Sequence, residues 1–375
     1  MNGLAATARN TRAPIRLGLG IVLVSITACA GAPVHTQGHA RGRGALVAER
    51  GPGRSSPPQE VADSDGQSGE RAQAARPRAI TKPASPAKPG SPRIPAKAAQ
   101  RGQTKGPWKV DLSPAAKVGE RFAMQVTASM QQTFIQRVDG DERKVDVQRS
   151  LTANAVGKVL EVNAIGQIVR SEYTITSCVG RTAKGERDVL AAGTVLTVRR
   201  TGPKPRLDAS SGPLSAADTL LLKLVFTTSE PKSTDQEMFG TAVRVHVGEQ
   251  WTIDTDKTAE LLAKAGAIID PADLSGSTTL EAATPCGGTT CLRVLTRFTA
   301  TGVRMAAIPP QATIVDSGIT GISLRTLPVD GSKSRATTDD RFKMHLIVGA
   351  TKGDKDIEIE AHVSSREVGV WTPLP

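Results

Sequence analysis

Apolar and polar residues alternate with a period of two through most of the chain beyond residue 108. From Phe122 to Met130 every second residue is apolar, and polar residues or alanine stand between them. The same alternation returns near the end of the chain, where Ile357, Ile359, Ala361 and Val363 would share one face. Because successive side chains of a strand point to opposite faces, both segments are predicted to be half-buried β-strands.

The same pattern, bounded by Gly and Asp turns, predicts many further strands and few helices. The segment near the end of the chain spans 356–364, and the other predicted strands span 143–151, 157–162, 167–179, 194–199, 242–247, 249–253, 278–283, 292–299, 313–316, 319–327 and 342–348. Two short helices are predicted over 211–226 and 257–265. The expected fold is therefore mainly β, with large, curved antiparallel sheets arranged as a sandwich or half-barrel and one or two short helices.

A short motif occurs twice. Val118-Gly119-Glu120 and Val247-Gly248-Glu249 are each followed two residues later by an aromatic residue that opens a strand-like run. This repetition suggests two similar halves, 108–227 and 243–375, joined by a loop-like segment within 227–242.

Composition divides the chain at residue 108. All ten aromatic residues lie at or beyond Trp108, whereas the stretch 30–107 has none and contains eleven prolines. A segment of this kind cannot bury enough apolar surface to offset the entropy lost on ordering. The sequence therefore predicts a disordered Pro/Ala/Gly-rich tether over 29–107 and a folded β-rich domain over 108–375.

The net charge of +12 suggests nucleic-acid binding only until it is divided along the chain. Residues 1–29 contribute +3, residues 30–107 contribute +8 from 13 basic and 5 acidic residues, and residues 108–375 contribute +1 from 32 and 31. Since the domain is nearly neutral, nucleic acid is not an expected partner. The basic tether is interpreted chiefly as a spacer, with anionic lipid, lipopolysaccharide or cell wall as the alternative partners.

The first 28 residues have the form of a secretion signal. Arg9, Arg12 and Arg16 precede an uncharged, largely apolar run over 17–28. This run is shorter than the ~20 residues that span a bilayer as a helix.

The end of that run, Ile26-Thr27-Ala28-Cys29, resembles the lipobox of bacterial lipoproteins. The resemblance implies removal of residues 1–28, a diacylglyceryl group on the Cys29 thiol, and further acylation of the palmitate type. It also implies a membrane-anchored protein of the cell envelope. Ala30, where aspartate would retain a lipoprotein at the inner membrane, favours the outer membrane, facing the periplasm or the surface.

The lipobox, the Pro-rich tail and the two Val-Gly-Glu-x-aromatic starts together resemble an uncharacterised family of lipoprotein domains from GC-rich Gram-negative bacteria. The resemblance covers about 108–375 and implies a β-rich envelope domain. It brings no assigned activity, so no functional residue is carried over from it.

Three cysteines remain for the domain. Cys286 and Cys291 enclose a four-residue loop between two strand-like runs, which in an oxidising compartment indicates a disulfide across a hairpin. A metal site or a redox-active pair is the less favoured alternative, because further ligands and a Cys-x-x-Cys motif are lacking. Cys178 alternates away from Tyr173, Ile175 and Val179, and is expected to be a packed or half-exposed free thiol, with pairing to Cys286 or Cys291 left open.

Candidate chemistry is otherwise sparse, and no metal or cofactor is predicted. His246, His345 and His362 are expected on polar strand faces. A site formed by His345, His362 and Glu360 is a second metal alternative, and Asp339-Asp340 is assigned to a solvated loop in preference to a weak calcium site. The sequence contains no Gly-x-Ser-x-Gly, His-Glu-x-x-His, Walker or dinucleotide motif.

The leading hypothesis is therefore a non-enzymatic binding or structural module anchored through lipid. The first alternative is a lipid- or lipoprotein-handling domain with an apolar groove. The second is a hydrolase whose site is dispersed along the chain, with a serine or aspartate beside one of the domain's histidines.

Overall fold

The computed structural model describes residues 106–201, 204–226, 234–309, 311–331, 334–352 and 354–375. The predicted signal peptide, Cys29 and all of the predicted tether except Gly106 and Pro107 lie outside these residues.

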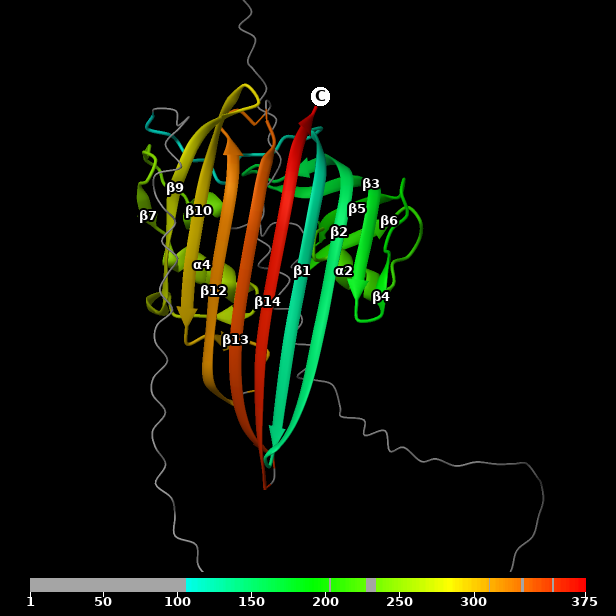
Figure 1. The fold of residues 1–375 in the computed structure, drawn as a ribbon, viewed down its shortest axis with the longest axis vertical. Helices are drawn as coiled ribbons and strands as arrows, with labels where there is room; N and C mark the ends of the chain where they lie inside the picture. Colours follow the sequence, from blue (N-terminus) through cyan, green and yellow to red (C-terminus); the bar gives the residue numbers. More distant parts are fainter. Residues whose placement is uncertain (1–105, 202–203, 227–233, 310, 332–333, 353) are drawn as a thin grey trace, which may run out of the picture. The chain divides into compact units, whose positions relative to one another are not determined.

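One large antiparallel sheet dominates the described residues (Figure 1). Its twelve strands are β1 (Arg121–Val138), β2 (Asp141–Val162), β3 (Ile168–Thr182), β4 (Gly185–Asp188), β5 (Val195–Thr201), β6 (Lys204–Ala209), β7 (Gln250–Thr252), β9 (Leu274–Cys286), β10 (Thr289–Thr301), β12 (Thr313–Pro328), β13 (Ala336–Lys352) and β14 (Lys355–Leu374). They run in the order β6-β5-β3-β2-β1-β14-β13-β12-β10-β9-β7, and β4 pairs with β3. A separate ribbon joins β8 (Ala267–Ile268) to β11 (Arg304–Met305).

Several strands are longer than the sequence predicts. The predicted segments 143–151 and 157–162 belong to the single strand β2, and 313–316 and 319–327 belong to β12. These strands continue through glycines because a strand neighbour is present on both sides there. At Gly321, a Cβ atom would clash with the ring of Phe298 on the adjacent strand, so the glycine makes room for an aromatic core residue.

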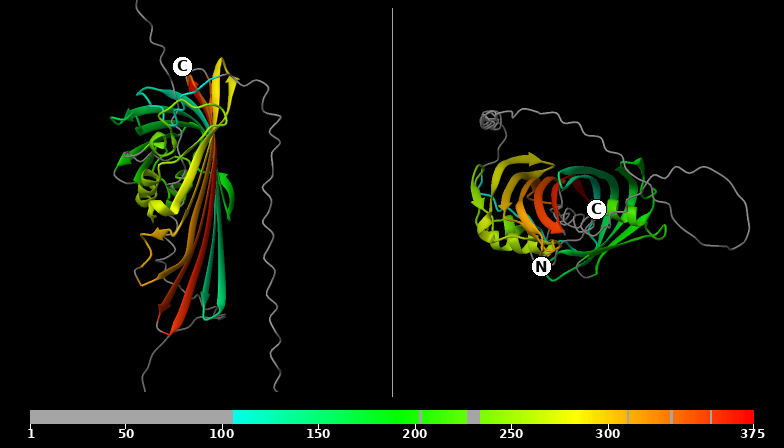
Figure 2. Two further views of the ribbon diagram at one scale, coloured as in Figure 1. Left: turned by 90° about the vertical axis from the view of Figure 1, so that its left-hand side faces the viewer. Right: turned by 90° about the horizontal axis from the view of Figure 1, so that it is seen from below.

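Three short α-helices lie among the described residues: α2 (Ala216–Leu222), α3 (Asp235–Phe239) and α4 (Thr255–Lys264), with a 3₁₀ turn at Pro271–Asp273. Each α-helix begins at a polar side chain that accepts a backbone N–H: Ser215, Thr234 and Asp254. The predicted helix over 211–226 is shortened to α2, which begins after its N-cap Ser215 and ends at Leu222, before the C-cap Lys223. The helices lie on one face of the sheet, where α2 contacts β2 and α4 contacts β9 (Figure 2).

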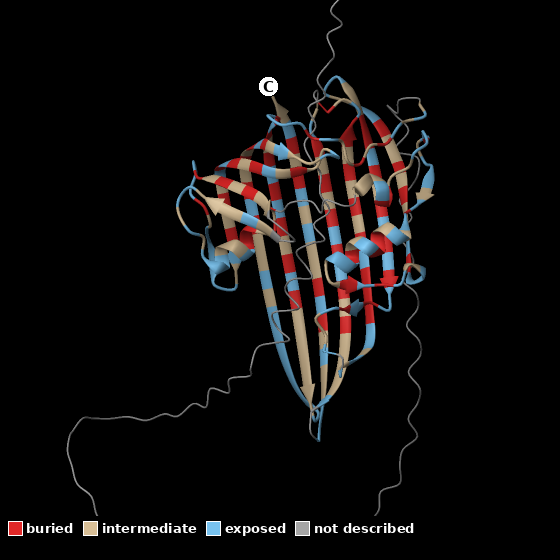
Figure 3. Ribbon diagram, turned by 180° about the vertical axis from the view of Figure 1, so that it is seen from behind, coloured by how far each residue is buried: buried red, intermediate tan, exposed pale blue. Residues whose placement is uncertain are grey.

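We call the face that carries the helices the inner face and the opposite one the outer face. The sheet curves and is open, because its end strands β6 and β7 do not pair with each other (Figure 2). Buried residues alternate with exposed ones along the strands, as Figure 3 shows. The predicted large, curved antiparallel sheet is therefore confirmed as one open sheet, and a sandwich of two large sheets is not formed by the described residues.

The two Val-Gly-Glu turns have the same hydrogen-bond pattern. Gly119 and Gly248 have φ of 86° and 92°, which favours glycine at both positions. The Gly119 N–H donates to Val159 O, and the Val159 N–H donates back to Glu120 O. In the second turn, the Gly248 N–H donates to Leu280 O, and the Leu280 N–H donates back to Glu249 O. The similarity of the halves 108–227 and 243–375 remains a prediction, with this shared turn in its favour.

The segment between these halves departs from expectation. The predicted strand 242–247 is wrong, since only Val245 pairs there, in an isolated bridge with Trp108. The predicted loop 227–242 contains α3, which Thr234 and Glu237 start as a capping box. Trp251 Nε1 donates to Phe239 O, so the short helix is held by tertiary contact rather than by its own length.

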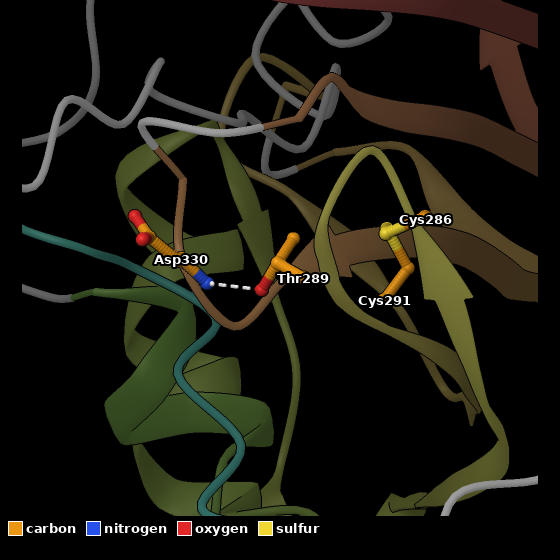
Figure 4. Close-up of a disulfide and its surroundings, with 4 residues drawn as sticks. All are labelled: Cys286, Thr289, Cys291 and Asp330. Carbon is orange, nitrogen blue, oxygen red and sulfur yellow. Dashed lines mark hydrogen bonds between the residues drawn. A yellow bond between two sulfur atoms is a disulfide. The ribbon is translucent and has the colours of Figure 1, made fainter.

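Cys286 and Cys291 form the predicted disulfide across the turn between β9 and β10, with their Cα atoms 5.7 Å apart (Figure 4). The connection between β12 and β13 is held to the same turn, because the Asp330 N–H donates to Thr289 Oγ1. For so short a loop the cross-link contributes about 2 kcal/mol by constraining the unfolded chain.

Candidate functional site

The predicted lipid attachment site, Cys29, lies outside the described residues. In the part of the chain that is described, no helix is long and apolar enough to cross a membrane. The candidate site in the domain is therefore sought on the sheet.

A row of polar residues crosses the inner face of five adjacent strands. Its members occupy paired positions from β9 to β14: Thr278, Thr296, Ser323, Asp340 and Glu367. The first four are buried, and Glu367 is half-buried. The Thr278 and Thr296 hydroxyls are 3.0 Å apart and share a hydrogen bond. On a face whose buried residues are mostly apolar, this row is a concentration of buried polar groups.

Arg325 is the buried cation of this row, two residues beyond Ser323 on β12, and only 3% of its side chain is exposed. Its Nη1 lies 2.7 Å from Asp235 Oδ2 at the start of α3, and its Nε donates to Ser323 Oγ over 3.1 Å. Burial opposes the charge, but Asp235, Asp340 and Glu367 together raise the pKa of the guanidinium above its ordinary value. Arg325 thus fixes α3 to the middle of the sheet.

Asp340 is the buried anion. Burial raises the pKa of its carboxyl to about 6, although Arg325 and the Ser323 hydroxyl favour the charged form. The Ser323 hydroxyl affects this pKa, but neither Oδ atom has a hydrogen bond of regular geometry among the described residues. Desolvation therefore dominates at this carboxyl.

Several buried polar atoms beside this pair have no hydrogen-bond partner within the described part of the chain. They are Arg325 Nη2, Thr338 Oγ1 and both Oδ atoms of Asp340, and Gln132 Nε2 and Ser317 Oγ lie further along the same face. Buried polar atoms in native proteins are normally hydrogen-bonded. The cluster offers donors and acceptors together, which suits an exchangeable polar group such as water or a hydroxyl group, and it contains no cysteine or histidine.

The inner face continues past the helices along the long central strands (Figure 1). Core residues Leu346 and Ala361 are buried there. Towards the tips they are followed by inner-face apolar residues that are half-buried or exposed: Phe134, Val138, Val145, Val147, Val348, Ile357 and Ile359. Ile359 is 38% exposed and Val145 44%. We call these seven residues the apolar extension.

The histidines lie away from both features. His345 and His362 are directly paired on β13 and β14, as a hairpin of these segments implies, and both point to the exposed outer face. Asp316 lies 3.2 Å from His345, and Glu360 lies 2.6 Å from His362. Among the described residues no group of three or more metal-ligating side chains is close enough to hold an ion. His246 is exposed in the second Val-Gly-Glu turn.

Two sequence assignments need correction. Asp339 and Asp340 do not lie in a loop, because both belong to β13 and point to opposite faces of the sheet. Sequence reasoning also missed Arg325 and Asp340 as partners. The sequence did contain a signal for Asp340. It alternates in phase with Phe342 and Met344, so a strand through these residues places all three on the same buried face.

Cys178 is the second correction. It is a free thiol with no exposed surface, and it shares the inner face with Tyr173 and Ile175 rather than alternating away from them. A β-bulge beside Ser177 shifts the register and reverses the alternation. Burial raises the pKa of this thiol to about 12, so it is a packed core residue rather than a nucleophile.

No protein-family model matches the chain, and no curated protein matches its sequence. Among solved structures, MucB in complex with MucA(peri) is 9% identical over 63% of this chain and 88% of that chain, with a TM-score of 0.13. A TM-score this low supports no conclusion about fold or function.

Proposed function

We propose that this chain is a lipid-anchored, non-enzymatic envelope protein whose open sheet binds an elongated apolar chain, such as a lipid acyl chain, on its inner face. The observation that carries the proposal is the apolar extension, which runs from the core to an exposed tip without a covering helix among the described residues. Exposed apolar surface that adjoins a core is typical of ligand and interaction sites.

The shape of this surface favours a chain-like ligand. From Phe134 to Val138 the strand β1 advances about 14 Å along the extension. The apolar extension also spans neighbouring strands from β2 to β13, so a flexible chain could contact several of them at once.

The anchor is proposed on the resemblance of Ile26-Thr27-Ala28-Cys29 to a lipobox. In cells given an alkyne analogue of palmitate, the wild-type chain is expected to incorporate the label and Cys29→Ala to lose it. Cys178→Ala is the matched control, because it removes a different thiol and should keep the label. Labelling of Cys29→Ala at the wild-type level would contradict lipidation at this position.

Ligand binding is tested with the chain from residue 30 onward, produced without lipid, and a fluorescent fatty acid. Phe134→Asn/Ile359→Asn is expected to raise the dissociation constant at least tenfold, since two apolar contacts are lost at ~1.5 kcal/mol or more each. The readout is the fluorescence titration, with the free energy of unfolding of each variant measured in parallel.

Ile135→Asn/Ile347→Asn is the matched control for that experiment. Ile135 follows Phe134 on β1, Ile347 pairs with Glu360 beside Ile359, and both point to the outer face. This variant should bind as the wild type does. Equal loss of binding in the two double variants would show that the inner face is not the site.

A further inference from the structure

The middle of the outer face carries an excess of positive charge. Arg341 and Lys343 follow each other on this face of β13, Arg366 is paired with Arg341 from β14, and Arg297 lies level with Arg341 two strands away on β10. All four side chains are exposed. We call these four residues the basic band.

One carboxylate lies within the basic band. Asp339 accepts hydrogen bonds from both Arg341 and Arg366, at 2.8–3.2 Å. These bonds lower the pKa of Asp339 to about 2, so it stays ionised. Like charges directly opposite each other destabilise a sheet. Asp339 therefore fixes two arginines side by side, and the band of four cations and one carboxylate keeps a net charge of +3.

Arg297 and Lys343 make no ion pair with any described residue, which leaves their charges free for a partner. Their outer-face neighbours are neutral hydrogen-bonding residues rather than acids: Ser129, Gln131, Thr299, Thr320 and Ser364. Other acidic residues of this face are already paired: Arg137 holds Glu142, Glu358 and Glu360 at 2.5–3.1 Å nearer the strand tips, and Arg293 holds Glu281 at 3.0 Å. The outer face thus has an excess of positive charge in its middle, whereas the acidic residues nearer the strand tips are held in ion pairs with Arg137.

We infer that the basic band docks on the phosphate headgroups of an anionic phospholipid leaflet. Arginine presents a planar fork of donors that matches phosphate oxygens, and hydroxyl and amide groups around the band can donate to the same oxygens. Since the band lies on the outer face, docking leaves the apolar extension on the other face of the sheet free for its ligand. The inference does not depend on Cys29 or on that ligand.

The test uses the chain from residue 30 onward, without lipid, and sedimentation with phosphatidylcholine vesicles that contain or lack phosphatidylglycerol. Arg297→Gln/Lys343→Gln is expected to weaken binding to the anionic vesicles at least tenfold, as each cation near such a surface contributes about fivefold. Binding of the wild type should fall as salt is added.

Lys117→Gln/Lys184→Gln is the matched control, because it removes two exposed charges from turns and leaves the basic tether intact. It should weaken binding less than threefold. Arg341→Gln/Arg366→Gln/Asp339→Asn removes the paired part of the band as a unit, a net loss of one positive charge, and should weaken binding about fivefold. Equal effects of the two double variants, or no effect of either, would overturn the inference.

A cell-wall partner would also overturn it. That outcome would appear as wild-type binding to purified sacculi that Arg297→Gln/Lys343→Gln abolishes, with vesicle binding unchanged. Fatty-acid binding by Arg297→Gln/Lys343→Gln should equal that of the wild type, so failure of this inference is distinct from failure of the proposed function.

Discussion

Replacing Arg325 by methionine is expected to lower the free energy of unfolding by about 3–5 kcal/mol. The substitution removes the cation that contacts Asp235 at 2.7 Å and faces the buried Asp340. Two carboxylates would then remain close together in the interior without a counter-charge, and α3 would lose its contact with the sheet. Urea unfolding at pH 7, followed by circular dichroism, measures the change.

Arg297→Met is the matched control for this loss. Arg297 lies on the adjacent strand β10 but is exposed on the outer face, so its replacement should change the free energy of unfolding by no more than about 0.5 kcal/mol. Adding Asp340→Asn to Arg325→Met should recover part of the lost stability, because it removes an uncompensated carboxylate. A cost below about 1 kcal/mol for Arg325→Met would contradict this account of the buried ion pair.

Replacing Asp340 by asparagine is expected to remove a pH dependence of stability. The folded-state pKa of Asp340 is raised to about 6, above the unfolded value of about 3.9. Its contribution to stability is therefore fully present below about pH 4 and is lost as the pH rises through 6. The difference in the free energy of unfolding, Asp340→Asn minus wild type, should increase by about 2–3 kcal/mol between pH 4 and pH 7.

Asp339→Asn provides the control with the opposite sign. The pKa of Asp339 is lowered to about 2 by hydrogen bonds from Arg341 and Arg366, so its contribution is present above about pH 4 and is lost as the pH falls through 2. Asp339→Asn should be less stable than the wild type at pH 7, and this difference should shrink towards pH 2. If the two asparagine variants showed the same pH profile, burial would not be the cause of the raised pKa of Asp340, and the two arginines would not be the cause of the lowered pKa of Asp339.

Much of the fold follows from the chain pattern alone. The alternation from Phe122 to Met130 assigns β1 and its buried face, because strand side chains have a period of two whatever the neighbours are. The loop between Cys286 and Cys291 indicates its own disulfide, because both residues are close in the chain. These are local properties, and tertiary contacts leave them unchanged.

Other features depend on neighbours that the pattern does not reveal. The predicted strand over 242–247 is absent because the backbone of that segment pairs only with Trp108, through Val245, and α3 exists because Trp251 and Arg325 hold it. The bulge in β3 moves Cys178 into the core, and a one-residue shift is enough to exchange the faces of a strand.

By itself, then, the sequence determined the mainly β fold, the side of many strands that is buried, and the cross-link between Cys286 and Cys291. Only the tertiary structure decided which strands are neighbours. That choice aligned Ser323, Asp340 and Glu367 into one buried row and brought Arg297, Arg341 and Arg366 into one exposed band. The physical reason is that hydrophobic alternation selects a face for each side chain, whereas strand order and register select which side chains share it.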